Sequence, residues 1–205
     1  MRASIGGDSF ENALAGSKSQ IQNEKKHGLE AVTWLKNKLL PISPQITHIG
    51  SGNHDFTRSN KINGHPPSEI LALLLNKPFF RSFGCVMFNV RKNLYTILSQ
   101  HSGKKEEKIE WVQANIYYHE HNHKLGTGLR PYTVEPNKIN KTWIARPTYH
   151  LQGGSYLNWA ESYASDKMYR PHENGSCIAE LSGGKEEWKV TTFDDISLFK
   201  RLVLK

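Results

Sequence analysis

The middle of the chain consists of Cys85-Val86-Met87-Phe88-Asn89-Val90-Arg91-Lys92-Asn93-Leu94-Tyr95-Thr96-Ile97-Leu98-Ser99-Gln100. β-Branched and aromatic residues are frequent here, and they favour strands because they pack well on a pleated surface. The turn residues Ser102-Gly103-Lys104-Lys105 follow, and Lys108–His119 is again rich in strand-forming residues. This pattern predicts a long β-hairpin.

More β-structure is predicted towards the C-terminal end. Thr142–Leu151 has the composition of a strand, and Tyr156–Met168 places apolar residues along one side of a helix. Cys177–Leu181 and Trp188–Thr192 are expected to pair as a second hairpin. A last helix or strand is expected to follow them.

Helices are predicted before the hairpin. Apolar residues recur at helical spacing over Leu29–Leu40, and a second helix is expected over Pro66–Leu75, with an extended loop or short strands over Gly50–Gly64. The predicted fold class is α+β, with N-terminal helices followed by a mostly antiparallel, curved β-sheet and a C-terminal helix or strand. We expect residues 1–26 to form an N-terminal arm and residues 27–205 to form a single α+β domain.

Composition narrows the class of protein. The chain has 205 residues, 37% of them hydrophobic, and a formal net charge of +8. Its longest apolar run, Ile70–Leu75, is too short to span a membrane, and the two cysteines Cys85 and Cys177 do not suggest a disulfide framework. We therefore expect a cytoplasmic protein whose partner carries phosphates, with a homodimer left open.

Basic residues outnumber acidic ones between Arg81 and His150, and aromatic residues are interleaved among them. Unpaired bases stack on aromatic rings, while Lys and Arg neutralise the phosphate backbone. The sequence therefore predicts a DNA- or RNA-binding surface. Its expected members are Arg58, Lys61, Arg91, Lys104, Lys105, Arg130, Lys141, Arg146, Trp143 and Tyr118.

Three histidines alternate at the end of the predicted hairpin, at His119, His121 and His123. Alternate residues of a strand project from one face, so the three imidazoles are candidate ligands of a divalent metal ion such as Zn²⁺. Further ligands must come from elsewhere, and the sequence does not place His150 or Glu180 nearby. Without a metal, one of these histidines is a candidate general base.

A Gly-rich loop ends in Gly52-Asn53-His54-Asp55. These residues resemble the Gly-Asn-His-Asp motif of calcineurin-like metallophosphoesterases, in which the Asn ligates a metal and the His touches the phosphate. The family also has Asp-x-His and Gly-Asp motifs on upstream strands, whereas the residues before Gly50 are interpreted as one acid-poor helix without such pairs. Gly64-His65-Pro66 lacks the second histidine of the family's closing Gly-His-x-His motif. From its residue types alone, the loop with the nearby basic residues suits phosphate binding.

Restriction-type nucleases offer another pattern, in which carboxylates hold Mg²⁺ and a lysine helps to activate water. Glu106-Glu107-Lys108 contains Glu-x-Lys but lies in the predicted turn, and Glu180 is the better single carboxylate because apolar residues flank it. A Walker A loop, a Rossmann fingerprint and a Gly-x-Ser-x-Gly elbow do not occur in the sequence. Their absence argues against nucleotide hydrolases, dehydrogenases and serine hydrolases.

Together these features predict an enzyme that acts on nucleic acid, either an endonuclease or a base-modifying or base-excising enzyme of the restriction, defence or toxin type. The expected catalytic residues are His119, His121, His54, Asp55 and Glu180, and the expected cofactor is a divalent metal ion, Mg²⁺ or Zn²⁺. One alternative is a DNA- or RNA-binding protein without catalytic activity. A second alternative is a metal-dependent enzyme acting on small molecules, because His119-Glu120-His121 resembles the first motif of cupins.

Overall fold

The computed structural model describes residues 2–7, 9–10, 26, 28–61, 64–81, 83–101, 114–120, 126–137, 142–153, 175–183 and 190–193. These residues divide between two compact units. The first unit holds the described residues up to Gly84 together with Gln100 and His101, and the second holds the others. Within the described ranges, no helix has the length and apolar character needed to cross a bilayer.

The first unit is built on a parallel sheet of three short strands. These are β1 (Ala3–Ile5), β2 (Ile46–Gly50) and β3 (Phe79–Phe80), in the order β1-β2-β3, so that β2 is central. Most of β2 is buried, including Ile46 and Ile49. A short, apolar central strand of this kind is typical of a parallel sheet with packed neighbours.

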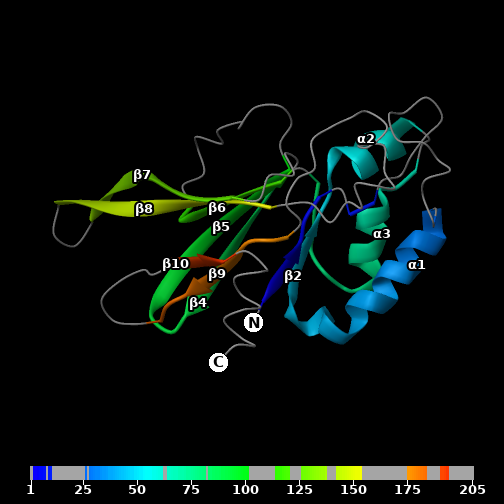
Figure 1. The fold of residues 1–205 in the computed structure, drawn as a ribbon, viewed down its shortest axis with the longest axis horizontal. Coiled ribbons are helices and arrows are strands. Elements are labelled where there is room, and N and C mark those ends of the chain that lie inside the picture. Colours follow the sequence, from blue (N-terminus) through cyan, green and yellow to red (C-terminus); the bar gives the residue numbers. More distant parts are fainter. Residues whose placement is uncertain are drawn as a thin grey trace. The chain divides into compact units, whose positions relative to one another are not determined.

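Helices complete the first unit (Figure 1). They are α1 (Gly28–Leu39), which continues into the 3₁₀ helix η2 (Leu40–Gln45), then α2 (Asn53–Lys61) and α3 (Pro67–Leu74). α1 and α3 pack against each other, and α3 packs against β2. Their apolar faces form one core with the sheet, and its buried members are Phe10, Val32, Ile46, Ile49, Leu71, Ala72 and Leu75.

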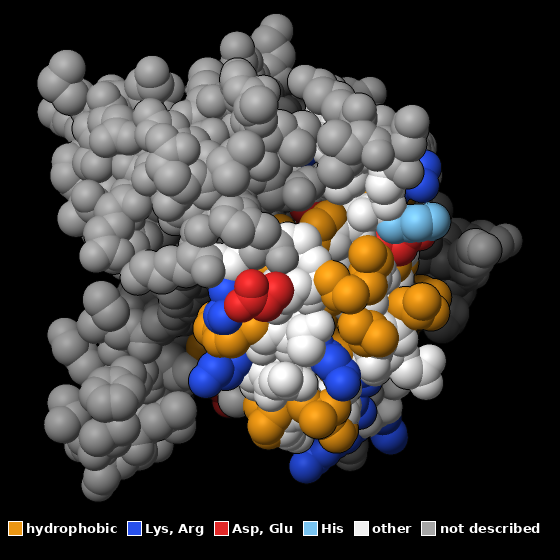
Figure 2. Space-filling model, turned by 90° about the vertical axis from the view of Figure 1, so that its right-hand side faces the viewer, with side chains coloured by type: hydrophobic (Ala, Val, Ile, Leu, Met, Phe, Trp, Pro, Cys, Tyr) orange, Lys and Arg blue, Asp and Glu red, His pale blue; other side chains and the backbone are white. Residues whose placement is uncertain are grey.

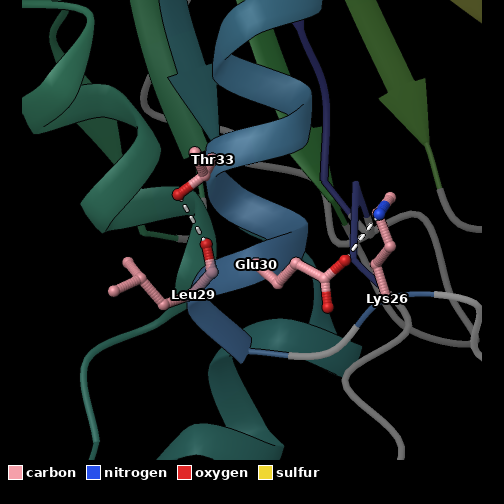
Figure 3. A network of polar contacts seen from close by, with 4 residues as sticks. All are labelled: Lys26, Leu29, Glu30 and Thr33. Atoms are coloured by element: carbon pink, nitrogen blue, oxygen red, sulfur yellow. Dashed lines mark hydrogen bonds and ion pairs between the residues drawn. The ribbon is translucent and has the colours of Figure 1, made fainter.

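Polar contacts define the first turns of α1 (Figure 3). Lys26 forms an ion pair with Glu30 at 2.5 Å, and Thr33 Oγ1 donates a hydrogen bond of 2.8 Å to the carbonyl oxygen of Leu29. Glu30 also places negative charge in the first turn, where the helix dipole is positive. These contacts favour a helix that begins at Gly28.

Hydrophobic side chains are also exposed on these helices, among them Leu29 and Trp34 of α1 and Leu73 and Leu74 of α3. Figure 2 views the side of the molecule on which α1 and α3 lie, and hydrophobic groups there alternate with Lys and Arg side chains. Scattered apolar exposure of this kind is common on protein surfaces.

The second unit contains two sheets. The larger has the order β4-β5-β6-β8-β7, with β4 at Phe83–Val90, β5 at Asn93–His101, β6 at Ile116–Glu120, β7 at Gly126–Asn137 and β8 at Thr142–Gln152. The first residues of β4 and the last of β5 belong to the first unit. β6 runs parallel to β8, and β7 is antiparallel to β8. β9 (Ile178–Leu181) and β10 (Val190–Phe193) form a separate antiparallel pair.

A second core lies in this unit. Tyr95, Ile116 and Leu151 are its buried members, and apolar residues of β9 pack against them. The Tyr95 hydroxyl donates a hydrogen bond of 2.6 Å to the carbonyl oxygen of Ser182, which satisfies the polar end of a fully buried ring. This bond ties the segment after β9 to β5.

The structure confirms that the protein contains both helices and strands, but it differs from the sequence-based prediction in four places. Instead of one mostly antiparallel sheet, the first unit has a parallel sheet, and the larger sheet of the second unit contains the parallel pair β6 and β8. The predicted loop over Gly50–Gly64 contains helix α2, and the predicted arm over residues 1–26 contributes strand β1. The stretch Cys85–Gln100 is itself a hairpin that turns at Arg91-Lys92, where Arg91 has a φ of 57°. The predicted turn over residues 102–105 lies outside the described residues.

Candidate functional site

Three segments that are distant in sequence meet at one end of the first unit. Gly7 follows β1, Gly52 follows β2, and His101 is the last residue of β5. A Cβ atom added to Gly7 would lie 2.6 Å from His101 Nδ1 and 2.8 Å from both Cα and N of Gly52. The backbone at Gly7 therefore approaches the other two segments more closely than any side chain allows. We call Gly7, Gly52, Asn53, His54 and His101 the strand-end site.

Asn53 and His101 are in direct contact within this site. His101 Nε2 donates a hydrogen bond of 2.9 Å to Asn53 Oδ1. Asn53 is exposed and His101 is half-buried, so solvent can reach the pair. An amide oxygen and an imidazole nitrogen that converge at the carboxyl ends of parallel strands suit metal or ligand binding, because ligands of parallel sheets bind at this edge.

The strand-end site also fits a metal ion in the donor atoms it offers. Asn53 Oδ1 is an oxygen donor and His101 offers a ring nitrogen, and the close approach of Gly7 to Gly52 and His101 brings the backbone of β1's end beside them. Within the described part of the chain, however, no group of three or more His, Cys, Asp or Glu side chains is placed around one point. Further ligands would have to come from residues outside it.

Asp55 shapes the loop of the strand-end site. Its side chain is fully buried, and Oδ1 accepts hydrogen bonds from Ser51 Oγ at 2.7 Å and from the Gly52 backbone N–H at 2.9 Å. Gly52 precedes helix α2 and Asp55 is three residues further on, which is the spacing of a capping box. The catalytic role that the sequence predicts for Asp55 stays a prediction, and its observed contacts are those of a helix cap.

We expect Asp55→Ala to lower the free energy of unfolding by about 2 kcal/mol, because it removes the acceptor of two buried hydrogen bonds. Asp55→Asn keeps an acceptor oxygen in the same place and should lose clearly less. Urea denaturation of both variants measures the difference. Equal losses for the two variants would show that the bonds to Oδ1 do not stabilise the loop.

His48 lies in β2, behind the strand-end site. It is 3% exposed, its Nδ1 is 3.0 Å from Thr47 Oγ1, and its ring centroid is 4.9 Å from that of Phe80. Burial lowers the pKa of His48 from 6.5 to about 4, because the charged imidazolium is poorly solvated there. His48 is therefore neutral at physiological pH.

Other predicted residues lie along α2. His54 and Arg58 are half-buried, one helical turn apart, and the backbone of Lys61 ends the helix. The N-terminus of a helix attracts anions through its free N–H groups and its dipole. Lys104 and Lys105 lie outside the described residues.

The second unit holds the remaining candidates that the structure describes. His119 of β6 is half-buried, and its Nε2 is 3.2 Å from Nδ1 of His150 on β8. Tyr118 also lies on β6 and packs against the second core, whereas Arg91 and Glu180 are exposed. Sequence reasoning named His150 as a ligand by type, and the structure brings it beside His119.

Some predicted residues have only a backbone position. Arg130 of β7 is opposite Thr148, while Arg146 and Trp143 of β8 are opposite Thr133 and Pro136. Like Lys104 and Lys105, the candidates His121, His123 and Lys141 lie outside the described residues. The predicted nucleic-acid surface therefore stays a prediction.

Sequence reasoning did not identify Gly7 or His101 as members of a site. The stretch Gly6-Gly7-Asp8 was a usable signal. It directly follows the short strand β1 and lies many residues before the next strand, β2. His101 carried a weaker signal as the polar end of strand β5, followed by Ser102-Gly103.

Comparisons with known proteins give little that bears on the site. No protein-family model and no curated protein matches the chain. Among solved structures, the solution NMR structure of protein TM1076 from Thermotoga maritima is similar over 77% of this chain and 87% of that chain, at 13% sequence identity and a TM-score of 0.33. The site is therefore interpreted from its own residues.

Proposed function

We propose that the protein is a metal-dependent phosphoester hydrolase that acts on nucleic acid, with the strand-end site as its centre. The observation that carries this proposal is the contact of His101 with Asn53 beside the close approach of Gly7 to Gly52. Amide and imidazole donors on a glycine-lined edge, next to a helix N-terminus, provide groups for a metal and for a phosphate.

The motif pattern of the metallophosphoesterases supports the same proposal. Gly7-Asp8 comes one residue after β1, a strand parallel to β2, and is a Gly-Asp pair that the interpretation of this region as one helix had missed. An Asp-x-His pair does not occur in the sequence before Gly50.

Roles within the strand-end site follow from residue type. Asn53 and His101 would hold the metal, with the Asp8 carboxylate as a further ligand by the same motif, and the bound metal would polarise a phosphoryl oxygen. His54 begins the helix next to Asn53 and, as in the resembling motif, would contact the phosphate. The dipole at the N-terminus of α2 would favour the same anion, and Asp55 holds this loop in shape.

Charge supports nucleic acid as the substrate. The formal net charge of +8 attracts polyanions, and much of the excess lies between Arg81 and His150. The alternative is a protein that binds DNA or RNA without cleaving it, for which the same basic residues are sufficient. The two functions differ in whether metal produces turnover.

We expect the purified protein to hydrolyse bis(p-nitrophenyl) phosphate and labelled DNA or RNA when Mn²⁺, Mg²⁺ or Zn²⁺ is supplied, and to stop when EDTA is added. Asn53→Ala and His101→Ala should each lower kcat/KM by roughly 100-fold or more, because each removes a proposed metal ligand. His65→Ala is the matched control, since His65 is exposed and forms an ion pair with Glu69.

Intact substrates with every metal, together with salt-sensitive binding, would favour the non-catalytic alternative and overturn the proposal. Base loss that persists in EDTA would instead indicate a base-excising enzyme. Full activity in both the Asn53 and the His101 variant would remove the strand-end site from the reaction.

A further inference from the structure

A pair of histidines in the second unit lies on neighbouring strands. Tyr117 of β6 is opposite His150 of β8 in the parallel register, which places His119 one pleat further along the same face as Tyr117. His119 Nε2 and His150 Nδ1 are 3.2 Å apart, and both side chains are half-buried. Both histidines belong to the second unit.

The two rings meet through these nitrogens. Their planes are within 13° of parallel, but their centroids are 5.3 Å apart, which is much longer than the separation of the nitrogens. The rings are therefore in contact edge to edge. Tyr117 stacks on His150, with centroids 4.9 Å apart and planes within 12°, and so helps to hold the His150 ring in this orientation.

We propose that His119 and His150 form a two-imidazole chelate for a borderline divalent metal ion such as Zn²⁺, Co²⁺ or Ni²⁺. Two nitrogens bound to one tetrahedral ion at roughly 2.0–2.1 Å are about 3.3 Å apart, because the ligand–metal–ligand angle is near the tetrahedral value. The observed separation of 3.2 Å matches this spacing. Imidazole ligands select such ions over Mg²⁺ and Ca²⁺, which prefer oxygen.

Metal binding by the two histidines requires one proton to change position. In the metal-free pair, one imidazole donates its N–H to the other ring. When a metal binds, that proton moves to the second nitrogen of the donating ring, so that both facing nitrogens present lone pairs. A neutral pair therefore releases no proton, and two coordination positions remain for water or another oxygen donor.

A metal held in this way joins β6 to β8. The two histidines are 31 residues apart in the chain, so the ion would link strands that are distant in sequence. Metal that binds only the folded state stabilises it by mass action. At about 100 times its dissociation constant, the ion should raise Tm by roughly 5–10 °C.

Equilibrium dialysis of the full chain against Zn²⁺ tests the proposal. Besides any Zn²⁺ held at the strand-end site, the wild type should bind one equivalent that His150→Gln binds roughly tenfold more weakly or not at all. Millimolar Mg²⁺ should not displace this equivalent. His65→Gln is the control and should match the wild type. His150→Gln should keep phosphodiester hydrolysis. His101→Ala should lose hydrolysis but still bind the Zn²⁺ equivalent held by His119 and His150. Failure of the proposed function is therefore distinguishable from failure of the chelate.

Unchanged Zn²⁺ binding in His150→Gln would overturn the chelate. If that variant does not fold, labelling of the wild-type protein with diethyl pyrocarbonate tests the chelate instead. Zn²⁺ should protect both His119 and His150 from modification, and EDTA should reverse the protection. Equal labelling with and without Zn²⁺ would also overturn the chelate.

Discussion

Gly7→Ala should lower the free energy of unfolding by about 3 kcal/mol and abolish metal-dependent hydrolysis. The added methyl group would lie 2.8 Å from backbone atoms of Gly52 and 2.6 Å from His101 Nδ1. Gly52 cannot retreat easily, because its N–H is bonded to the buried Asp55 carboxylate. The clash must therefore separate β1 from the loop that carries Asn53.

Gly50→Ala is a matched control for this prediction. Its added methyl group would meet its nearest neighbours at 3.6–3.8 Å, which is ordinary van der Waals contact. We expect its free energy of unfolding to stay within about 0.5 kcal/mol of the wild type. Urea denaturation and hydrolysis of bis(p-nitrophenyl) phosphate measure both variants. A Gly7→Ala protein as stable and active as Gly50→Ala would show that the close approach is unimportant.

Acid should destabilise the first unit through His48. Burial lowers the pKa of His48 in the folded protein to about 4, against 6.5 for an ordinary histidine. Between these values the unfolded chain binds a proton that the folded chain does not, so stability rises with pH. The contribution of neutral His48 to the free energy of unfolding is fully present above about pH 6.5. It falls by about 3 kcal/mol as the pH drops to about 4.

His48→Gln removes this titration and should flatten the dependence of the unfolding free energy on pH between about 4 and 6.5. His65→Gln, which replaces an exposed histidine, should keep the wild-type slope. Urea denaturation at a series of pH values provides the measurement. If wild type and His48→Gln show the same slope, burial of His48 is not the origin of acid sensitivity.

Much of the local structure follows from local sequence signals. Apolar spacing predicts α1 over Leu29–Leu40, and the observed helix is Gly28–Leu39 followed by the 3₁₀ turn that begins at Leu40. Pro66-Pro67 opens the predicted helix that becomes α3. Each of these patterns extends over only one or two helical turns. The helix can therefore be predicted without knowledge of any contact between residues distant in sequence.

Other elements were missed for physical reasons. β1 and β3 are three and two residues long, and strands this short in a parallel sheet show no alternation. Helix α2 is polar along most of its length, so its main signal is the spacing of Gly52 and Asp55. The turn at Arg91-Lys92 was missed because it lacks the glycine that usually accompanies a positive φ.

By itself, the sequence determined the presence of helices and strands, the basic character of the chain, and the polar residue types of Gly52-Asn53-His54-Asp55. These properties depend on composition and on neighbours along the chain. Only the tertiary structure decided that Gly7 and His101 join Asn53, and that His150 lies beside His119. Both juxtapositions depend on the pairing of strands that are distant in sequence, and such pairing leaves no periodic pattern within either strand.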